Sequence, residues 1–286
     1  GNPPPPKKDA GNPPPPKKDA GNPPPPKKDA GPPPSAYKVA AVQYGTGQAA
    51  KVKPACASAS TPDLCAVQAL VQQADQAGAL LVVTPEYGLG QKYYEPTPVP
   101  GEVPATSSQW PAPSYVKILS QQAKQLKLFL VVNLLTYKGS KPSYSYYNTQ
   151  IAFGPAGAVL AVHHKYNLFG KEKTSLTAGN NVFVFSTPLG KVGLLICADI
   201  YGSSTMRGKL ANSLQARVVA VSSYWTVSNA VGWYKSYAST WGVYAVVANT
   251  THSPGYGGGI YNPAGKPLAQ KVAGSPSIVY AMIPAP

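Results

Sequence analysis

The segment VGLLICADIYG, residues 192–202, begins as an unbroken apolar run and turns polar after Cys197. Its apolar half is typical of a buried strand. A second apolar run, Phe183–Ser186, precedes it across Thr187–Gly190, a Thr-Pro-Leu-Gly turn that is typical of a β-hairpin. A hairpin set among alternating strands and helices predicts an α/β domain with mixed sheets rather than an all-β sandwich or a helical bundle.

The same alternation extends over residues 35–286, which we expect to form the folded part of the chain. Thr61 is a plausible helix N-cap with Pro62 at the first helical position, and Leu64, Val67 and Val71 give that helix an apolar stripe. Further helices are expected at Pro113–Leu126, 204–215 and Asn229–Tyr244. Strands are expected at Tyr37–Gln43, Ala79–Thr84, Leu128–Thr136, Asn148–Phe153, Ala158–His163, Phe183–Ser186, Lys191–Cys197, Val218–Ser222, Ala245–Asn249, Gly259–Tyr261, Pro267–Gln270 and Ile278–Ile283.

Three of these strands end in a reactive polar side chain. LLVVTPEYGLG leads into Glu86, LAVHHKYNLFG leads into Lys165, and VGLLICADIYG leads into Cys197. Taken singly, the Glu is commonly a cap, the Lys a solvated charge and the Cys a small core residue. Ligands of α/β sheets bind just beyond strand ends, and a carboxylate, an ammonium and a thiol together can serve acyl transfer. We therefore expect the three to share one site.

Residues 1–34 have a composition that cannot build a core. They contain three copies of GNPPPPKKDA followed by GPPP, and hold 15 of the 33 prolines. Runs of four prolines favour an extended polyproline II conformation, so we expect a disordered, proline-rich arm that acts as a spacer. The alternative is a docking arm in which three tandem copies contact a surface or a cell wall with avidity.

Charge and hydropathy exclude two classes of protein. The formal net charge is +15, but the only arginines are Arg207 and Arg217 and the lysines are scattered, so no nucleic-acid partner is expected. No apolar run approaches the roughly 20 residues that a membrane-spanning helix needs, so no integral membrane segment is expected.

We consider two alternatives for the three cysteines. Cys56 and Cys65 are nine residues apart and Cys197 stands alone, so the chain has either one disulfide and one free thiol or three free thiols. We favour the disulfide, which implies a secreted or extracytoplasmic protein whose signal peptide has been removed; the alternative is a cytoplasmic one. No CxxC pair occurs, and the histidines do not cluster with cysteines at metal spacing, so no metal site is expected.

The three strand-end motifs resemble those of the nitrilase (carbon–nitrogen hydrolase) superfamily, whose catalytic set is Glu-Lys-Cys. PEYG, HKYNLFG and LLICADIYG match the family's motifs in the family's order. The longer stretches YNTQIAFGPAGAVLAVHHKYNLF, STPLGKVGLLICADI and GGGIYNPAG are similar to the biotinidase and vanin branch of exported amidases. The resemblance implies a nitrilase-like α-β-β-α four-layer sandwich with mixed sheets, in domains that commonly pair as homodimers.

The resemblance also implies roles for the site residues. Cys197 would be the nucleophile that forms a thioester with the acyl group of a small linear carboxamide, with Lys165 favouring its thiolate. Glu86 would be the general base, and Lys165 with the backbone N–H of Ala198 would stabilise the oxyanion. This chemistry needs no cofactor.

Further residues near the motifs are candidates for supporting the site or lining its pocket. Glu172 would orient Lys165 or a water molecule, or would simply be solvated. Asp199 would hold the turn after Cys197, or pair with a Lys or Arg, and His164 would point away from the site on an alternating strand. Pocket-lining candidates are Tyr87, Asn133, Tyr166, Tyr201, Tyr224 and Trp225.

Two other functions remain as hypotheses. One is a nitrile hydrolase of the same superfamily. The other is a catalytically idle nitrilase-like domain that acts as a binding module on the proline-rich arm. The presence of Glu86, Lys165 and Cys197 together favours an active enzyme.

Overall fold

The computed structural model describes residues 34–108, 110, 113–201, 206, 208–227, 229–252, 257–271 and 274–286. The predicted proline-rich arm, apart from Pro34, lies outside the described residues. Pro34–Pro286 forms one compact unit. Its described part is a mixed α/β domain, as the alternation of strands and helices predicted.

The first sheet has a parallel centre and antiparallel margins. Its strands are β13 (Ser277–Pro284), β1 (Ala36–Gln43), β2 (Leu81–Val83), β4 (Phe129–Lys138), β5 (Ser145–Phe153) and β6 (Val159–His164), in that order. The neighbours β1, β2 and β4 are parallel, whereas β13, β5 and β6 join by antiparallel pairing. The short strand β3 (Tyr94–Pro96), which the sequence did not predict, pairs with β4.

The second sheet repeats this arrangement. Its order is β12 (Pro267–Gln270), β11 (Gly259–Tyr261), β10 (Tyr244–Ala248), β9 (Val218–Ser222), β8 (Gly190–Ile196) and β7 (Val184–Thr187). The three strands β8, β9 and β10 are parallel, and the hairpin predicted around residues 187–190 joins β7 to β8. Both sheets therefore mix parallel and antiparallel pairing.

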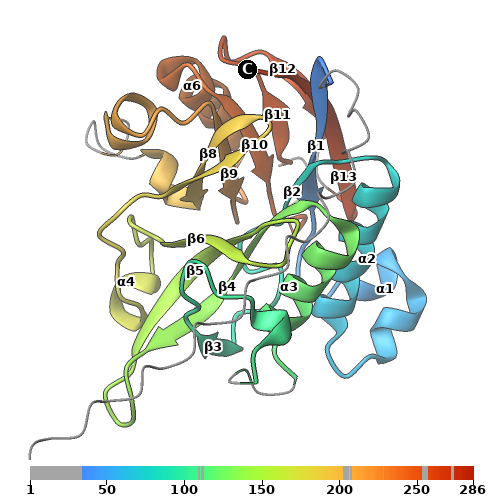
Figure 1. Cartoon of the computed structure of the whole chain (residues 1–286), viewed down its shortest axis with the longest axis vertical. Helices are drawn as coiled ribbons and strands as arrows, with labels where there is room; N and C mark the ends of the chain where they lie inside the picture. Colours follow the sequence, from blue (N-terminus) through green and yellow to red (C-terminus); the bar gives the residue numbers. More distant parts are fainter. Residues whose placement is uncertain are drawn as a thin grey trace, which may run out of the picture. The chain divides into compact units, whose positions relative to one another are not determined.

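The helices and sheets form layers (Figure 1). Three apolar cores lie between these layers. Alternate residues of β4 face opposite ways: Leu130 and Val132 pack with the helices α2 (Pro62–Gln76) and α3 (Tyr115–Leu126), while Val131 packs between the sheets. Beyond the second sheet, Leu195 packs with Tyr234 of α6 (Ala230–Trp241). The order is thus helices, sheet, sheet, helix.

Several predicted boundaries shift for local reasons. The helix expected to reach Tyr244 ends at Trp241, because Gly242 adopts a left-handed conformation that terminates it. The helix expected at 204–215 is described only as a π-helical turn, Gly208–Ser213, and residues 202–205 and 207 lie outside the description. Short turns of helix that the sequence did not predict are α1 (Ala49–Val52), η1 (Pro54–Ser58), η2 (Pro104–Thr106), η3 (Cys197–Tyr201) and α4 (Glu172–Ser175).

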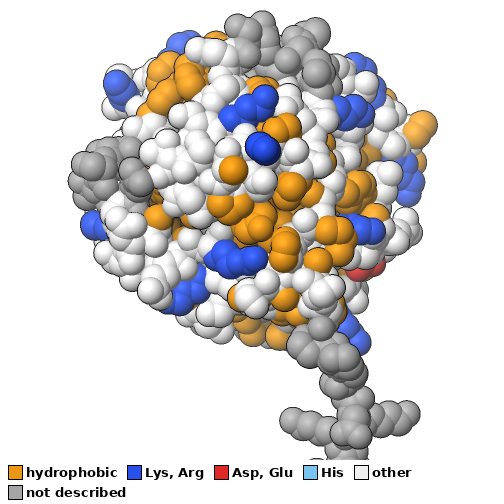
Figure 2. Space-filling model, turned by 90° about the horizontal axis from the view of Figure 1, so that it is seen from above, with side chains coloured by type: hydrophobic (Ala, Val, Ile, Leu, Met, Phe, Trp, Pro, Cys, Tyr) orange, Lys and Arg blue, Asp and Glu red, His pale blue; other side chains and the backbone are white. Residues whose placement is uncertain are grey.

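The cysteines are paired as we favoured. A disulfide joins Cys56 in η1 to Cys65 in α2, and Cys197 is free and buried. Among the described residues, no helix has the length and apolar character needed to cross a membrane. On the face shown in Figure 2, lysine and arginine side chains lie apart from one another rather than forming one basic patch.

Candidate active site

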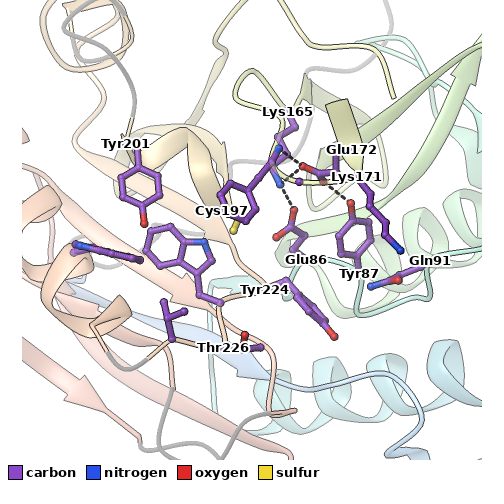
Figure 3. Close-up of a pocket in the computed structure, with 15 residues that line it drawn as sticks. Glu86, Tyr87, Gln91, Lys165, Lys171, Glu172, Cys197, Tyr201, Tyr224 and Thr226 are labelled. Carbon is purple, nitrogen blue, oxygen red and sulfur yellow. Dashed lines mark hydrogen bonds and ion pairs between the residues drawn. The ribbon is translucent and has the colours of Figure 1, made fainter. Parts of the chain in front are cut away.

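The three strand-end residues line one cavity of about 380 Å³ (Figure 3). Glu86 follows β2, Lys165 follows β6, and Cys197 follows β8, so both sheets contribute to the site. All three are buried, with exposed fractions of 1%, 2% and 5%. The fold therefore brings a carboxyl, an ammonium and a thiol to one place, as the sequence predicted.

Cys197 lies at a sharp break in the chain. The strand was predicted to end at Cys197, but β8 ends one residue earlier, at Ile196. Cys197 itself has φ 44°, a left-handed conformation that is uncommon for a residue with a side chain. Strained backbone of this kind persists only where surrounding contacts hold it. The chain therefore turns at Cys197 instead of continuing the strand, and Cys197 lines the cavity.

Asp199 supplies those contacts. Its Oδ2 accepts hydrogen bonds from the Ile196 N–H (3.0 Å) and from Nε2 of His163 (2.8 Å), and its Oδ1 accepts from the N–H groups of Tyr166 (3.0 Å) and Asn167 (2.8 Å). Asp199 is fully buried. One carboxylate therefore ties the turn after Cys197 to the loop after Lys165. Its side-chain partner is His163, and not a Lys or Arg.

Glu86, Lys165 and Glu172 form a buried charge cluster. Lys165 Nζ lies 2.7 Å from Glu86 Oε1 and 2.7 Å from Glu172 Oε2. Asn148 Nδ2 donates to Glu86 Oε1 (2.8 Å) and to Glu172 Oε1 (2.9 Å), and the Tyr87 hydroxyl also donates to Glu172. Of the two alternatives for Glu172, the structure therefore places it on Lys165.

Two asparagines support this cluster through hydrogen bonds. Asn133 donates to Asn148 Oδ1 (2.7 Å) and accepts a hydrogen bond from the Tyr87 N–H (2.9 Å). Both are fully buried on the adjacent strands β4 and β5. Sequence reasoning missed Asn148; the available signal was an asparagine at the start of the predicted strand Asn148–Phe153.

Burial governs protonation at the site. Burial raises the pKa of the Cys197 thiol well above its usual range, and Glu86 adds to the rise, while Lys165 lowers it only in part. Lys165 thus favours the thiolate, as expected, but loss of hydration outweighs the effect of its ammonium on the thiol pKa. Burial likewise raises the pKa of Glu86, with a further rise from the Glu172 charge against the lowering by Lys165.

Nearby negative groups outweigh burial at Lys165 and keep its ammonium charged. Burial lowers its pKa, but the nearby Glu86, Cys197 and Glu172 more than offset this and raise it above the usual value. The pKa of Glu172 is lowered: burial raises it, but Lys165 and the hydrogen bonds from Tyr87 and the Phe169 N–H prevail. The cavity thus holds a thiol whose pKa is raised beside an ammonium that two carboxylates contact.

The predicted pocket residues divide into two groups. Tyr87, Tyr201, Tyr224 and Trp225 line the cavity. Asn133 and Tyr166 do not. Asn133 is buried and accepts a hydrogen bond from the Tyr87 N–H, and Tyr166 is partly buried against the core between α6 and the second sheet. Lining residues that the sequence analysis did not single out are Gln91, Phe169, Gly170, Lys171, Thr226, Val227 and Trp233.

The remaining two candidates lie close to the motifs. His164 does not line the cavity; its Nδ1 lies 2.9 Å from Thr149 Oγ1 and its ring stacks on Tyr147, as expected for a side chain that points away. Ala198 is buried directly after Cys197, and its carbonyl accepts a hydrogen bond from Asn167 (3.3 Å).

Known proteins resemble the chain in sequence and in fold. The family model described as carbon–nitrogen hydrolase matches residues 38–285. An omega-amidase of Xenopus laevis is 34% identical over 46% of this chain and 47% of its own length. A pantetheine hydrolase of Homo sapiens is 26% identical over 70% of this chain and 43% of its own length. The chain thus spans about half the length of the curated relatives it matches.

Solved structures share the fold. The amidase from Nesterenkonia sp. AN1, as a double mutant in complex with acrylamide, superposes with a TM-score of 0.68 at 22% identity, covering 88% of this chain and 92% of that one. Another mutant of the same amidase, with a TM-score of 0.67, 22% identity and the same coverage, shows covalent addition of the acetamide moiety of fluoroacetamide at its active-site cysteine.

Proposed function

Because the chain belongs to the carbon–nitrogen hydrolase family, we propose that it hydrolyses a small linear carboxamide through a thioester on Cys197. One observation carries the proposal: the buried Glu86–Lys165 ion pair and the free Cys197 thiol line the same cavity. The covalent adduct on the cysteine of the structurally similar amidase supports it.

The first half-reaction begins from a neutral thiol. Cys197 Sγ attacks the amide carbon while its proton passes to the Glu86 carboxylate, so that no free thiolate is needed in the buried cavity. The carbonyl oxygen takes the negative charge and is stabilised by the Lys165 ammonium and the Ala198 N–H. Lys165 does not need to move, because Glu86 and Glu172 fix its Nζ from two sides.

The tetrahedral intermediate then collapses. The carbonyl re-forms, the C–N bond breaks, and Glu86 returns its proton to the departing nitrogen, which leaves as ammonia or an amine. The acyl group remains on Cys197 as a thioester. Glu86 next removes a proton from water as the water attacks the thioester, and returns that proton to the Cys197 sulfur when the acid leaves. Asn148 holds Glu86 at one oxygen throughout.

A lysine ammonium that lines the cavity favours a neutral or anionic substrate over a cationic one. Lys171 also lines it, and within the described part of the chain its ammonium has no ion-pair partner, unlike Lys165. We expect Lys171→Gln to raise KM for amides that bear a carboxylate, by roughly threefold to tenfold, with little change for neutral amides. Lys173→Gln is the matched control, since Lys173 does not line the cavity.

The direct test is a substrate panel read by ammonia or amine release. Pantetheine, biotinyl-lysine, ureido compounds, simple aliphatic amides and the corresponding nitriles are compared for the wild type and Cys197→Ala. We expect amide turnover that is abolished in the variant while its circular dichroism is unchanged. Full activity of the variant would exclude the mechanism, and nitrile turnover alone would favour the nitrile hydrolase.

A second measurement separates an enzyme from an idle binding module. Iodoacetamide is expected to alkylate Cys197 at neutral pH, because Glu86 can accept the thiol proton as the sulfur reacts. A Cys197 that stays unlabelled until the protein is unfolded would favour the idle module.

We also propose that the protein works outside the cytoplasm. The Cys56–Cys65 disulfide supports this, because such bonds persist in oxidising compartments. Detection of the native protein only in the cytosolic fraction, with both thiols reduced, would contradict it.

A further inference from the structure

Three aromatic rings form one corner of the cavity, and they come from three separate elements. Tyr201 ends η3, Trp225 follows β9, and Trp233 lies on α6. The centroids of the Trp225 and Trp233 rings are 4.3 Å apart at 76°, and the Tyr201 ring lies 4.9 Å from each of them. All three residues line the cavity. We call this set the aromatic corner.

Trp225, the buried ring of the aromatic corner, is held in place by its neighbours. Trp225 is 8% exposed, and its backbone is held at both ends by Asn249, which accepts from the Trp225 N–H (2.9 Å) and donates to its carbonyl (3.0 Å). The Trp225 ring also stacks on Tyr234 at 5.5 Å. A ring fixed in this way loses little conformational entropy when a ligand packs on it.

The outer part of the corner is left uncovered. Tyr201 is 52% exposed although it lies beside a buried thiol. The charged residues that line the cavity lie elsewhere: Figure 3 shows Glu86, Glu172 and Lys171 on the opposite side of Cys197 from Tyr201. Among the residues that the structure describes, the corner therefore offers aromatic faces without a competing charge, which suits a flat, apolar ligand group.

The chemistry decides which part of the substrate lies there. Glu86 must reach the departing nitrogen, so the amine side of the scissile bond lies toward Glu86. The carbonyl oxygen lies toward Lys165. The substituent on the carbonyl carbon then extends away from Glu86, toward Tyr201.

We propose that the aromatic corner is the acyl subsite and that it selects carboxamides whose acyl group carries an aromatic ring close to the carbonyl, as in arylacetamides. This inference rests on the proposed function for the direction of the scissile bond. The binding preference itself rests only on the arrangement of the three rings.

Binding to the inactive Cys197→Ala protein tests the subsite separately from catalysis. Calorimetry compares phenylacetamide with cyclohexylacetamide, which has a similar size and apolar area but no aromatic face. We expect phenylacetamide to bind roughly threefold to tenfold more tightly, the range that aromatic pairs contribute beyond area. Trp233→Leu in the same background is expected to abolish the preference.

Two further variants keep the result interpretable. Trp241→Leu is the matched control, because Trp241 is also a partly buried tryptophan of α6 but does not line the cavity. It is expected to retain the preference. Tyr201→Leu changes a half-exposed side chain and is expected to reduce the preference even if Trp233→Leu fails to fold.

The outcomes distinguish the two proposals. Equal binding of both amides to Cys197→Ala overturns the aromatic subsite, and so does an undiminished preference in both Trp233→Leu and Tyr201→Leu. Preferential binding that is lost in either variant supports the subsite even if the wild type hydrolyses no amide, a result that would overturn only the proposed function. Wild-type turnover of both amides together with their equal binding to Cys197→Ala would leave the function standing and overturn the subsite.

Discussion

Asp199→Asn removes one charge beneath the site without changing the shape of the side chain. Asp199 accepts four hydrogen bonds, two at each oxygen. If the asparagine oxygen keeps the bonds from Tyr166 and Asn167, its NH₂ group replaces Oδ2 and faces two donors, the Ile196 N–H and the His163 Nε2–H. Hydrogen bonds to a charged acceptor contribute about 1.5–3 kcal/mol each, so losing two costs about 3–6 kcal/mol.

The easier burial of a neutral amide offsets part of that loss, so we expect a net destabilisation of about 2–4 kcal/mol. The strained turn at Cys197 would also relax, and kcat is expected to fall by about tenfold or more, because a small misplacement of reacting groups is costly. The effect on kcat should exceed the effect on KM, since the substrate contacts themselves remain.

Urea unfolding and steady-state kinetics measure the two effects. Asp75→Asn is the matched control, since the Asp75 side chain makes no hydrogen bond within the described residues. It should change the free energy of unfolding by less than about 0.5 kcal/mol. A similarly small change for Asp199→Asn, with kcat intact, would refute the view that this carboxylate holds the Cys197 turn.

The remaining predictions concern charge and covalent constraint. Glu172→Gln removes a charge that raises the pKa of Glu86, so the acid limb of kcat/KM should move to lower pH; an unmoved limb would mean that Glu86 is not the base. Burial, with nearby positive charge, lowers the pKa of His164 from 6.5 to about 3. The unfolded chain therefore takes up this proton first, and stability is lost as pH falls through that window; His164→Asn should reduce the loss in urea unfolding between about pH 7 and pH 4. Replacing Cys56 and Cys65 by serine should cost roughly 2–3 kcal/mol in the same assay, and activity at low temperature should persist because neither residue lines the cavity.

The sequence was most informative where local pattern and tertiary position agree. The strand preceding each of Glu86, Lys165 and Cys197 is apolar enough to be recognised alone, and strand ends in an α/β sheet converge on ligand sites. The strand Val218–Ser222 was predicted to the residue, since it is apolar on both faces and buried throughout.

The surroundings of the site could not be predicted in the same way. Asn148 reaches Glu86 across 62 positions of sequence, and His163 meets Asp199 across 36, so neither pair leaves a local pattern. Trp233 belongs to a helix whose apolar face is packed against the second sheet, and its place in the cavity follows from how α6 lies there. The left-handed turn at Cys197 arises because contacts from Asp199 override the strand propensity of the residues before it.

The direction of the pKa shift of the Cys197 thiol could not be predicted from the spacing of residues in the sequence either. A lysine next to a cysteine in sequence-based reasoning suggests a lowered thiol pKa. In the folded protein, burial and the Glu86 charge prevail, and the thiol pKa is raised. Activation therefore has to occur during the attack, with Glu86 receiving the proton.

The measurement that tests the central claim most directly is the mass of the protein quenched during amide turnover. The proposed function predicts an adduct equal to the acyl group on the peptide that contains Cys197, discharged by hydroxylamine and absent from Cys197→Ala. It should accumulate further in Glu86→Gln if that variant still acylates, because water activation also needs the carboxylate. Sustained amide turnover with no acylated Cys197 at any quench time would contradict the account.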